Sequence, residues 1–276
     1  GNTAGRMCPN TLFSISPVCI KQRRRSSIKK NIIQLKDVPL DTPLNRKQLE
    51  FIDSFKTKQP VIQKDKISAE LKQLTYPLYF LDFETFGPAV PRFDGLHPYG
   101  QCPFQYSCHI LDAKQEITHK EYLHTEPTDP RLSLLKSLID TLNDNGSIVA
   151  YHAGFEKGVI SKLAQQFPEY VKELEAINER FWDQLNIFRR YYTDYRFKGT
   201  NGLKSVLPVV VPGMGYSSLD VQEGSQAQLV WDRMISEKDE KEKGKLIQHL
   251  LEYCKLDTLA MVEIHKMLIK KKSIGN

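Results

Sequence analysis

The sequence of 276 residues predicts an α/β fold in which helices flank a mixed β-sheet. A compact apolar and aromatic run at 78–83 is typical of a buried strand, and the segments 104–111 and 119–124 follow it as two more strands. This order predicts an antiparallel meander. A helix at 131–142 then leads to a strand at 148–151, and a crossover helix between two strands makes a sheet partly parallel.

The chain beyond residue 151 is predicted to be mainly helical. Its final helix carries apolar residues on one face, which is the pattern of a helix packed against a sheet. A short apolar piece at 203–207 precedes Pro208, and the prolines, glycines and serines of 208–222 predict a loop. The expected helices are 155–167, 169–177, 182–192, 223–235 and 243–270.

Composition places the chain among globular proteins. Hydrophobic residues make up 40% of it, which excludes disorder and is ample for a buried core. No apolar run approaches the roughly 18 residues that a membrane span needs, and the N-terminal residues lack the pattern of a signal peptide. We therefore expect a cytoplasmic protein without a membrane partner. The five cysteines have no Cys-x-x-Cys spacing, which predicts reduced thiols rather than disulfides or a structural zinc site.

Positive charge is concentrated at the N-terminal end. The net charge is +6, and residues 1–72 hold 15 Lys and Arg against 6 Asp and Glu. This asymmetry indicates an anionic partner such as nucleic acid, although a solvated arm explains it as well. Frequent prolines and weak apolar periodicity predict that 1–75 is an extended basic arm or linker with one helix near 45–56. The folded domain is then expected over 76–272.

Two carboxylates end the most hydrophobic predicted strand. Asp82 and Glu84 are two residues apart, so alternation along the strand places both side chains on one face while Phe83 points the other way. Two like charges leaving a buried strand repel each other and lose hydration, and a bound divalent cation relieves both effects. The alternative is that the strand ends at Asp82 and both carboxylates face water.

A third carboxylate follows the strand at 148–151. Glu156 lies near the start of the next predicted helix, at the end of the sheet where a neighbouring parallel strand would present Asp82. The alternative is an ordinary one, because acidic residues are common in the first turn of a helix, where they complement its dipole.

The final predicted helix supplies a tyrosine and a fourth carboxylate. Tyr253 and Asp257 are four residues apart, so they lie on one face about one turn from each other, beside the apolar stripe. A helix packed on a sheet can direct both side chains into a shared cleft. Without a basic residue four positions away, a partly buried Asp in mid-helix is otherwise unfavourable.

Together the four carboxylates predict a site for two hard divalent cations. Oxygen ligands suit Mg²⁺ or Mn²⁺, and a pair of such ions supports in-line phosphoryl displacement. Tyr253 would orient the attacking water, since a phenol with an ordinary pKa of about 10 is a weak general base at neutral pH. The candidate metal ligands are Asp82, Glu84, Glu156 and Asp257, and the candidate catalytic residues are these four and Tyr253.

In order and spacing, these motifs resemble those of the DEDD exonucleases of the ribonuclease H-like superfamily, in their tyrosine variant. The Asp-x-Glu strand, the acid after a strand and the Tyr-x-x-x-Asp helix follow one another as in that family. Over about 76–270 the chain also resembles an uncharacterised bacterial exonuclease-like domain that often follows a RecB-type nuclease domain. The strings that carry this closer resemblance are 76–85, 103–107, 204–208 and 253–261.

The resemblance implies a ribonuclease H-like fold, with a mixed five-stranded sheet of an antiparallel meander plus parallel strands, flanked by helices. It also implies 3′-to-5′ hydrolysis of DNA or RNA by two metal ions, with a single-stranded 3′ end as the substrate. Residues 1–75 would then be a linker or the end of an upstream nuclease domain.

One residue departs from the family pattern. The second motif usually carries Asp, whereas this chain has Glu156, which reaches one methylene further. This difference affects the second of the two metal sites that the resemblance implies. Asp183 is an alternative acid for the cleft, and a helix N-cap is its other interpretation.

Two other functions are compatible with these motifs. One is a catalytically weak nucleic-acid-binding module with the same fold that serves an attached nuclease or a protein partner. The other keeps the metal site and acts on a small nucleotide or dinucleotide, which requires a short, closed cleft. Lys204, beside a predicted helix start, can meet a phosphate as a point charge, although most surface lysines have no specific role.

Overall fold

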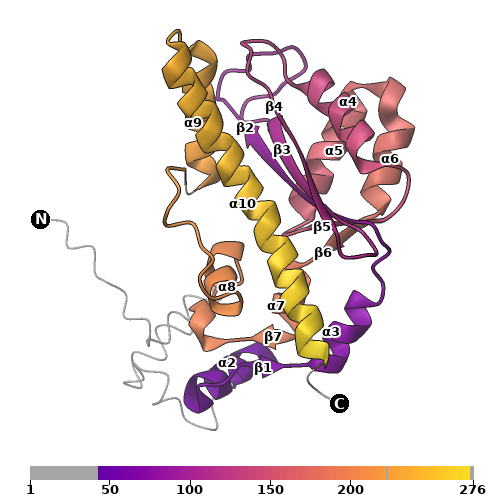
Figure 1. Cartoon of the computed structure of the whole chain (residues 1–276), viewed down its shortest axis with the longest axis vertical. Coiled ribbons are helices and arrows are strands. Elements are labelled where there is room, and N and C mark those ends of the chain that lie inside the picture. Colours follow the sequence, from indigo (N-terminus) through magenta and orange to yellow (C-terminus); the bar gives the residue numbers. More distant parts are fainter. Residues whose placement is uncertain (1–42, 222, 274–276) are drawn as a thin grey trace, which may run out of the picture.

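A five-stranded mixed sheet forms the centre of the computed structural model, which describes residues 43–221 and 223–273 (Figure 1). The strands are β2 (Leu78–Phe86), β3 (Cys102–Leu111), β4 (Ile117–Leu123), β5 (Ser147–Ala150) and β6 (Phe181–Asp183). They lie in the order β4, β3, β2, β5 and β6. The pairs among β4, β3 and β2 are antiparallel, whereas β2, β5 and β6 pair parallel. The predicted five-stranded mixed sheet is confirmed.

The central strand β2 is buried on both faces, as its nearly continuous apolar sequence indicates. Leu78 and Phe80 pack with Met261 on one face. Tyr79 and Leu81, which alternate with them, belong to the core on the opposite face. Asp82 and Glu84 continue the first series, so they leave the strand on the face that carries Met261.

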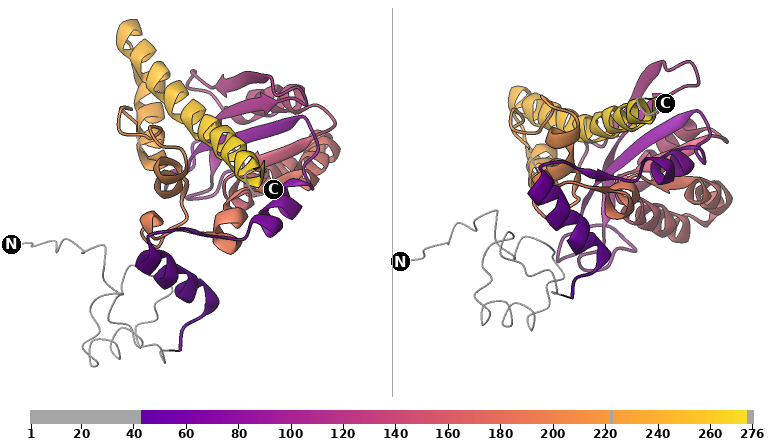
Figure 2. Two further views of the ribbon diagram at one scale, coloured as in Figure 1. Left: turned by 60° about the horizontal axis from the view of Figure 1, so that its bottom comes forward. Right: turned by 90° about the horizontal axis from the view of Figure 1, so that it is seen from below.

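Helices cover the two faces of the sheet. One face packs against α4 (Arg131–Leu142), α5 (Gly154–Gln166) and α6 (Val171–Glu179), which follows the 3-10 turn η3 (Pro168–Tyr170). The long helix α10 (Glu240–Ser273) crosses the other face, and Figure 2 shows it opposite the other three helices. The predicted helices 131–142, 155–167 and 243–270 are confirmed with small changes at their ends.

A second core holds α9 (Gly224–Ser236) against the end of the sheet. The ring of Trp231 stacks on Phe86 and Phe104, with centroids 4.6 and 4.7 Å away, and its indole nitrogen donates to the carbonyl of His124. Because Trp231 is fully buried, this contact fixes α9 beside the strand that carries the acidic residues. The predicted helix 223–235 is therefore confirmed.

The predicted helix 182–192 is wrong in its first part. Residues 181–183 form β6, which pairs with β5, and a short helix α7 (Leu185–Arg190) follows. Such a short strand is defined by its neighbour in the sheet, because Ile148 pairs with Phe181 and Ala150 with Asp183. Local apolar spacing favours a helix there, and the tertiary contact overrides it.

Two smaller corrections concern the segment after α7. The strand β7 (Tyr192–Thr193) and the turn η4 (Tyr195–Phe197) lie between α7 and α8 (Leu203–Val210). Helix α8 continues through Pro208, so the predicted loop at 208–222 begins later than expected.

Residues 43–75 differ from the expected extended arm. Helix α2 (Arg46–Thr57) begins with a capping box made by Asn45 and Gln48, in agreement with the helix expected near 45–56. The sequence did not predict the strand β1 (Val61–Ile62), which pairs with β7, or the helix α3 (Lys64–Leu71). The rest of the basic arm, 1–42, lies outside the described residues, and the boundary at 76 stays a prediction.

Two expectations from composition can be compared with the structure. Within the described residues, no helix is both long and apolar enough to cross a membrane. Cys102, Cys108 and Cys254 are free thiols, as predicted, and all three are buried. Cys8 and Cys19 lie outside the described residues.

Candidate metal centre

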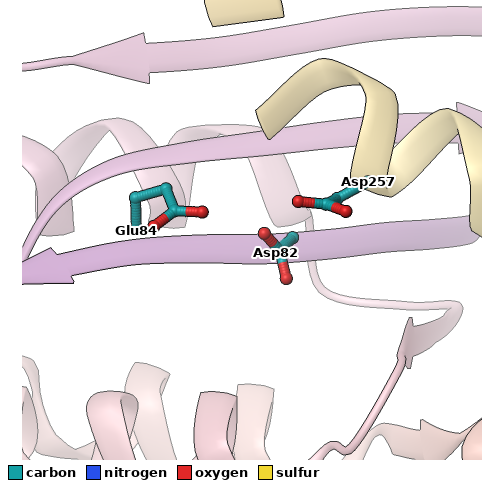
Figure 3. Close-up of side chains that lie close together, drawn as sticks. All are labelled: Asp82, Glu84 and Asp257. Carbon is teal, nitrogen blue, oxygen red and sulfur yellow. The ribbon is translucent and has the colours of Figure 1, made fainter. Parts of the chain in front are cut away.

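Three of the predicted metal ligands converge in the structure. Asp82 and Glu84 come from β2, and Asp257 comes from α10, which crosses above them (Figure 3). One carboxylate oxygen from each lies within 4.8 Å of the others. Glu84 and Asp257 are buried, and Asp82 is half-buried. The strand alternation and the helical spacing therefore bring together residues that are about 170 positions apart in the chain.

Local structure explains how the two strand carboxylates reach this position. Phe83, between them, points into the opposite core, so Asp82 and Glu84 share the face toward α10. The pairing register with β3 shifts between Glu84 and Thr85, and such irregularities are common beside functional sites. The thiol of Cys254 lies 3.9 Å from Oδ2 of Asp82, so α10 packs directly on this strand.

Burial raises the pKa values of the three carboxyl groups. The pKa of Glu84 rises to about 8, because the group is buried and faces the negative charge of Asp257. The pKa of Asp257 rises to about 6, where burial outweighs the hydrogen bond from Tyr216 and the charge of Lys204. Burial and the neighbouring acids raise the pKa of Asp82 well above its ordinary value. A cation placed among these groups would reverse this cost.

Glu156 lies outside the carboxylate triad. It occupies the first turn of α5, as predicted, and its side chain is buried. Its charge raises the pKa of Asp82, so the two groups are close enough to interact, but Glu156 does not line the cavity beside the triad. Burial, and then the charge of Asp183, raise the pKa of Glu156 itself to about 8. The role of Glu156 as a metal ligand stays a prediction.

One oxygen of Glu156, Oε2, is buried without a hydrogen-bond partner in the described part of the chain. We therefore expect Glu156→Gln to stabilise the metal-free protein at pH 8.5 by about 1–3 kcal/mol, because a neutral amide replaces a buried carboxylate whose negative charge lacks a partner. At pH 6.5 the gain should be smaller, because the folded carboxyl group, with a pKa of about 8, is then mostly protonated, whereas an unfolded one with the ordinary pKa of 4.5 is ionised at both pH values. Urea unfolding in a chelator at both pH values measures this difference.

Glu169→Gln, a change of the same kind at an exposed position, serves as the control and should alter stability little. A loss of stability in Glu156→Gln at pH 8.5 would show that the ionised carboxylate has a favourable partner.

Asp183 has a structural role. Its Oδ1 accepts hydrogen bonds from the backbone amides of His152, at 3.0 Å, and Leu185, at 3.1 Å. It thus joins the turn after β5 to the start of α7. The N-cap of α7 is Gln184, so the predicted N-cap role is wrong by one residue, although Asp183 does accept from the first amide of that helix. Asp183 does not line the cavity.

A cavity of about 780 Å³ adjoins the triad. Asp82, Glu84 and Asp257 form part of its wall, together with Tyr253. Other parts of the wall come from the turn after β5, from the start of α5, from α7 and from the loop before α8. Their lining residues include Tyr151, His152, Phe155, Arg189, Thr200 and Asn201.

Two residues next to Asp257 complete the site. Tyr216 donates a hydrogen bond from its hydroxyl to Oδ1 of Asp257 at 2.5 Å. Lys204 donates from Nζ to the Tyr253 hydroxyl at 3.2 Å, and its Nζ lies 5.2 Å from the centroids of the Tyr216 and Tyr253 rings. The sequence marked Lys204 as a phosphate contact only. No sequence signal marked Tyr216, because it lies in the predicted loop with no fixed spacing to the acidic motifs.

Comparisons with known proteins give a domain without an assigned function. Residues 79–202 match the family model described as a domain of unknown function (DUF2779). This match includes Asp82, Glu84 and Glu156 and ends before Tyr253 and Asp257. It fits the expectation of a domain of unknown function, and the resemblance to exonucleases stays a prediction.

One similar protein is the uncharacterized protein MG366 of Mycoplasma genitalium, which is 25% identical over 249 residues. The alignment covers 81% of this chain and 37% of that protein, so the chain spans little more than a third of its relative. No solved structure matches the chain. Residues 79–202 are thus similar to a domain family of unknown function, and the chain has a similar bacterial protein that is described as uncharacterized.

Proposed function

We propose that the chain is a metal-dependent exonuclease that hydrolyses phosphodiester bonds of single-stranded DNA or RNA from the 3′ end. The observation that carries the proposal is the convergence of Asp82, Glu84 and Asp257 within 4.8 Å at the wall of a cavity. Buried acids with strongly raised pKa values in a cleft are typical of functional sites. The substrate class and the direction rest on the family resemblance alone, whereas the mixed sheet is also compatible with the proposed ribonuclease H-like fold.

The donor set fits a hard divalent cation. The three side chains offer carboxylate oxygens, which Mg²⁺ and Mn²⁺ prefer, and the acids need a positive charge to ionise together. A bound pair of cations would activate water and stabilise the leaving oxygen of a phosphodiester. In this proposal Asp82, Glu84 and Asp257 hold cations, and Glu156, which lies outside the triad, acts on Asp82 through its charge.

Tyr253 would orient the attacking water. It lines the cavity beside Asp257 and receives a hydrogen bond from Lys204. Burial and the charges of the nearby acids raise its pKa, so the hydroxyl stays protonated. A protonated phenol positions water by hydrogen bonding rather than by removing its proton.

The remainder of the cavity wall suits the end of a nucleic acid strand. The volume of the cavity is in the range of sites that hold a molecule of nucleotide size. Phe155 is 38% exposed there, and an exposed ring can stack on a base. Arg189 lines the same cavity, and a guanidinium binds phosphate oxygens well.

A second candidate function is a catalytically weak nucleic-acid-binding module that serves an attached nuclease or a partner. The position of Glu156 favours it, because this residue is neither in the triad nor on the cavity wall. A missing fourth ligand would leave one cation weakly bound. The relative is much longer than this chain, so an attached nuclease domain belongs to the same proposal.

An end-label assay tests the proposed function. Single-stranded DNA and RNA, labelled at the 5′ or the 3′ end, are incubated with the purified chain in Mn²⁺, Mg²⁺ or EDTA and resolved on a gel. We expect 5′-labelled strands to shorten stepwise and 3′-labelled strands to release their label at once, in metal only. Intact strands that are nonetheless retarded at low salt would favour the binding module instead.

A further inference from the structure

Tyr216 makes a direct contact with Asp257 that the proposed reaction does not use. Its hydroxyl donates to Oδ1 of that carboxylate at 2.5 Å, and the tyrosine is only 8% exposed. Tyr216 comes from the segment between α8 and α9, whereas Asp257 belongs to α10. The contact therefore joins a separate part of the chain to the carboxylate triad.

The ring of Tyr216 is held by its surroundings and not only by Asp257. It is part of the core that contains Trp231, and its centroid lies 6.3 Å from that of Tyr253. The backbone around it is fixed by a turn, in which the amide of Leu219 donates to the carbonyl of Tyr216. A buried ring of this kind has few alternative positions, so its hydroxyl is a fixed donor.

A fixed donor restricts the carboxylate that accepts from it. An ionised carboxylate has about four lone-pair sites, so one hydrogen bond to Oδ1 leaves others for a cation. The bond holds the Asp257 side chain in one rotamer before any cation binds. Partners of metal ligands commonly act in this way, and losing one typically weakens metal binding 10–100-fold.

We infer that Tyr216 is a positioning residue for cation binding, which acts by fixing the Asp257 carboxylate opposite Asp82 and Glu84. This inference rests on the proposed function, since it takes the triad to be a metal site. Its effect should fall on the affinity for the cation alone, before any nucleic acid is present.

The test is Mn²⁺ binding by isothermal titration calorimetry with the full chain. Tyr216→Phe removes one oxygen and keeps the ring, so we expect the folded protein to bind Mn²⁺ 10–100-fold more weakly than the wild type. Tyr106→Phe is the matched control. Tyr106 is fully buried, and its hydroxyl is hydrogen-bonded to Ser137 and Thr141 on the opposite face of the sheet. The Tyr106→Phe protein should bind Mn²⁺ with the same affinity as the wild type.

The outcomes separate this inference from the proposed function. Equal Mn²⁺ affinity in Tyr216→Phe and the wild type overturns the inference. A loss of thermal stability that Tyr216→Phe and Tyr106→Phe share does not rescue it, because such a loss is a purely structural effect. Weaker binding in Tyr216→Phe supports it, whether or not the wild type cleaves nucleic acid. If the wild type binds no Mn²⁺ at millimolar concentrations, the inference and the proposed metal-dependent activity both fail.

Discussion

Replacing Asp82 by Asn is expected to lower the rate of metal-dependent phosphodiester hydrolysis at least about a thousandfold, which corresponds to about 4 kcal/mol of lost transition-state stabilisation. Burial, and then the charges of Asp257, Glu84 and Glu156, raise the pKa of Asp82 well above its ordinary value. An amide has nearly the same shape but cannot carry the negative charge that a shared cation requires. The measurement is kcat/KM on a 5′-labelled strand in saturating Mn²⁺.

A matched control makes this prediction specific. Asp53→Asn is the same chemical change on the exposed face of α2, and it should leave the rate unchanged. Asp82→Asn should also stabilise the metal-free protein, because it removes an acid that the neighbouring carboxylates repel. A variant that is more stable but inactive has not lost its fold. If Asp82→Asn kept more than a tenth of the activity, the carboxylate triad would not be the reaction centre.

The carboxylate triad was predictable because each part depends on a local regularity. Alternation along a strand placed Asp82 and Glu84 on one face, and the spacing of four placed Tyr253 beside Asp257. Both regularities survive in the structure because β2 and α10 are long elements with strong apolar patterns. The convergence of β2 with α10 followed from the expectation that the final helix packs on the sheet.

The other features depend on contacts that no local pattern encodes. β6 exists because Phe181 and Asp183 pair with β5, and β1 exists because it pairs with β7. Tyr216 reaches Asp257 from an irregular segment after α8, so its role depends on how the chain folds back. Sequence patterns describe single elements well, whereas pairings of two or three residues and contacts from loops are set by the tertiary structure.

Glu156 shows a third limit. Its place at the start of α5 was predicted, and so was its closeness to the end of β2. The spacing did not predict where its side chain points, and in the structure Glu156 does not line the cavity. A residue can therefore be correctly placed on its element while its role stays open to the experiments on Glu156→Gln and Mn²⁺ binding.

The metal-free protein is expected to lose stability as the pH rises from 6.5 to 8.5, by roughly 2 kcal/mol or more. Glu84 and Glu156 have ordinary pKa values of 4.5 that burial raises to about 8 in the folded chain. Between these values the folded state holds protons that the unfolded state has lost, so raising the pH favours unfolding. The stability that these groups contribute is complete below pH 4.5 and is lost as the pH passes 8.

Histidines set the lower limit of the pH range in which the stability measurement reports on the acids alone. Burial lowers the pKa values of His109, His119 and His265 from 6.5 to about 4, so the unfolded state binds more protons between these values. Their contribution rises with pH up to about 6.5 and is constant above it. The decline between pH 6.5 and 8.5 therefore reports on the acids and not on these histidines.

A cation should cancel this decline. Ionised carboxylates bind Mn²⁺ and protonated ones do not, so Mn²⁺ at about 100 times its Kd should add about 2.7 kcal/mol at pH 8.5. The gain at pH 6.5, at the same total Mn²⁺, should be smaller because protons compete for the same oxygens. Chemical unfolding at both pH values, with Mn²⁺ or EDTA, measures all four stabilities. Glu84→Gln should make the metal-free decline smaller, because of the two glutamates only Glu156 then contributes to it. The contradicting outcome is a stability in EDTA that stays constant or rises from pH 6.5 to 8.5. The acids would then already have cationic partners within the protein, and they would not need a metal ion to ionise together.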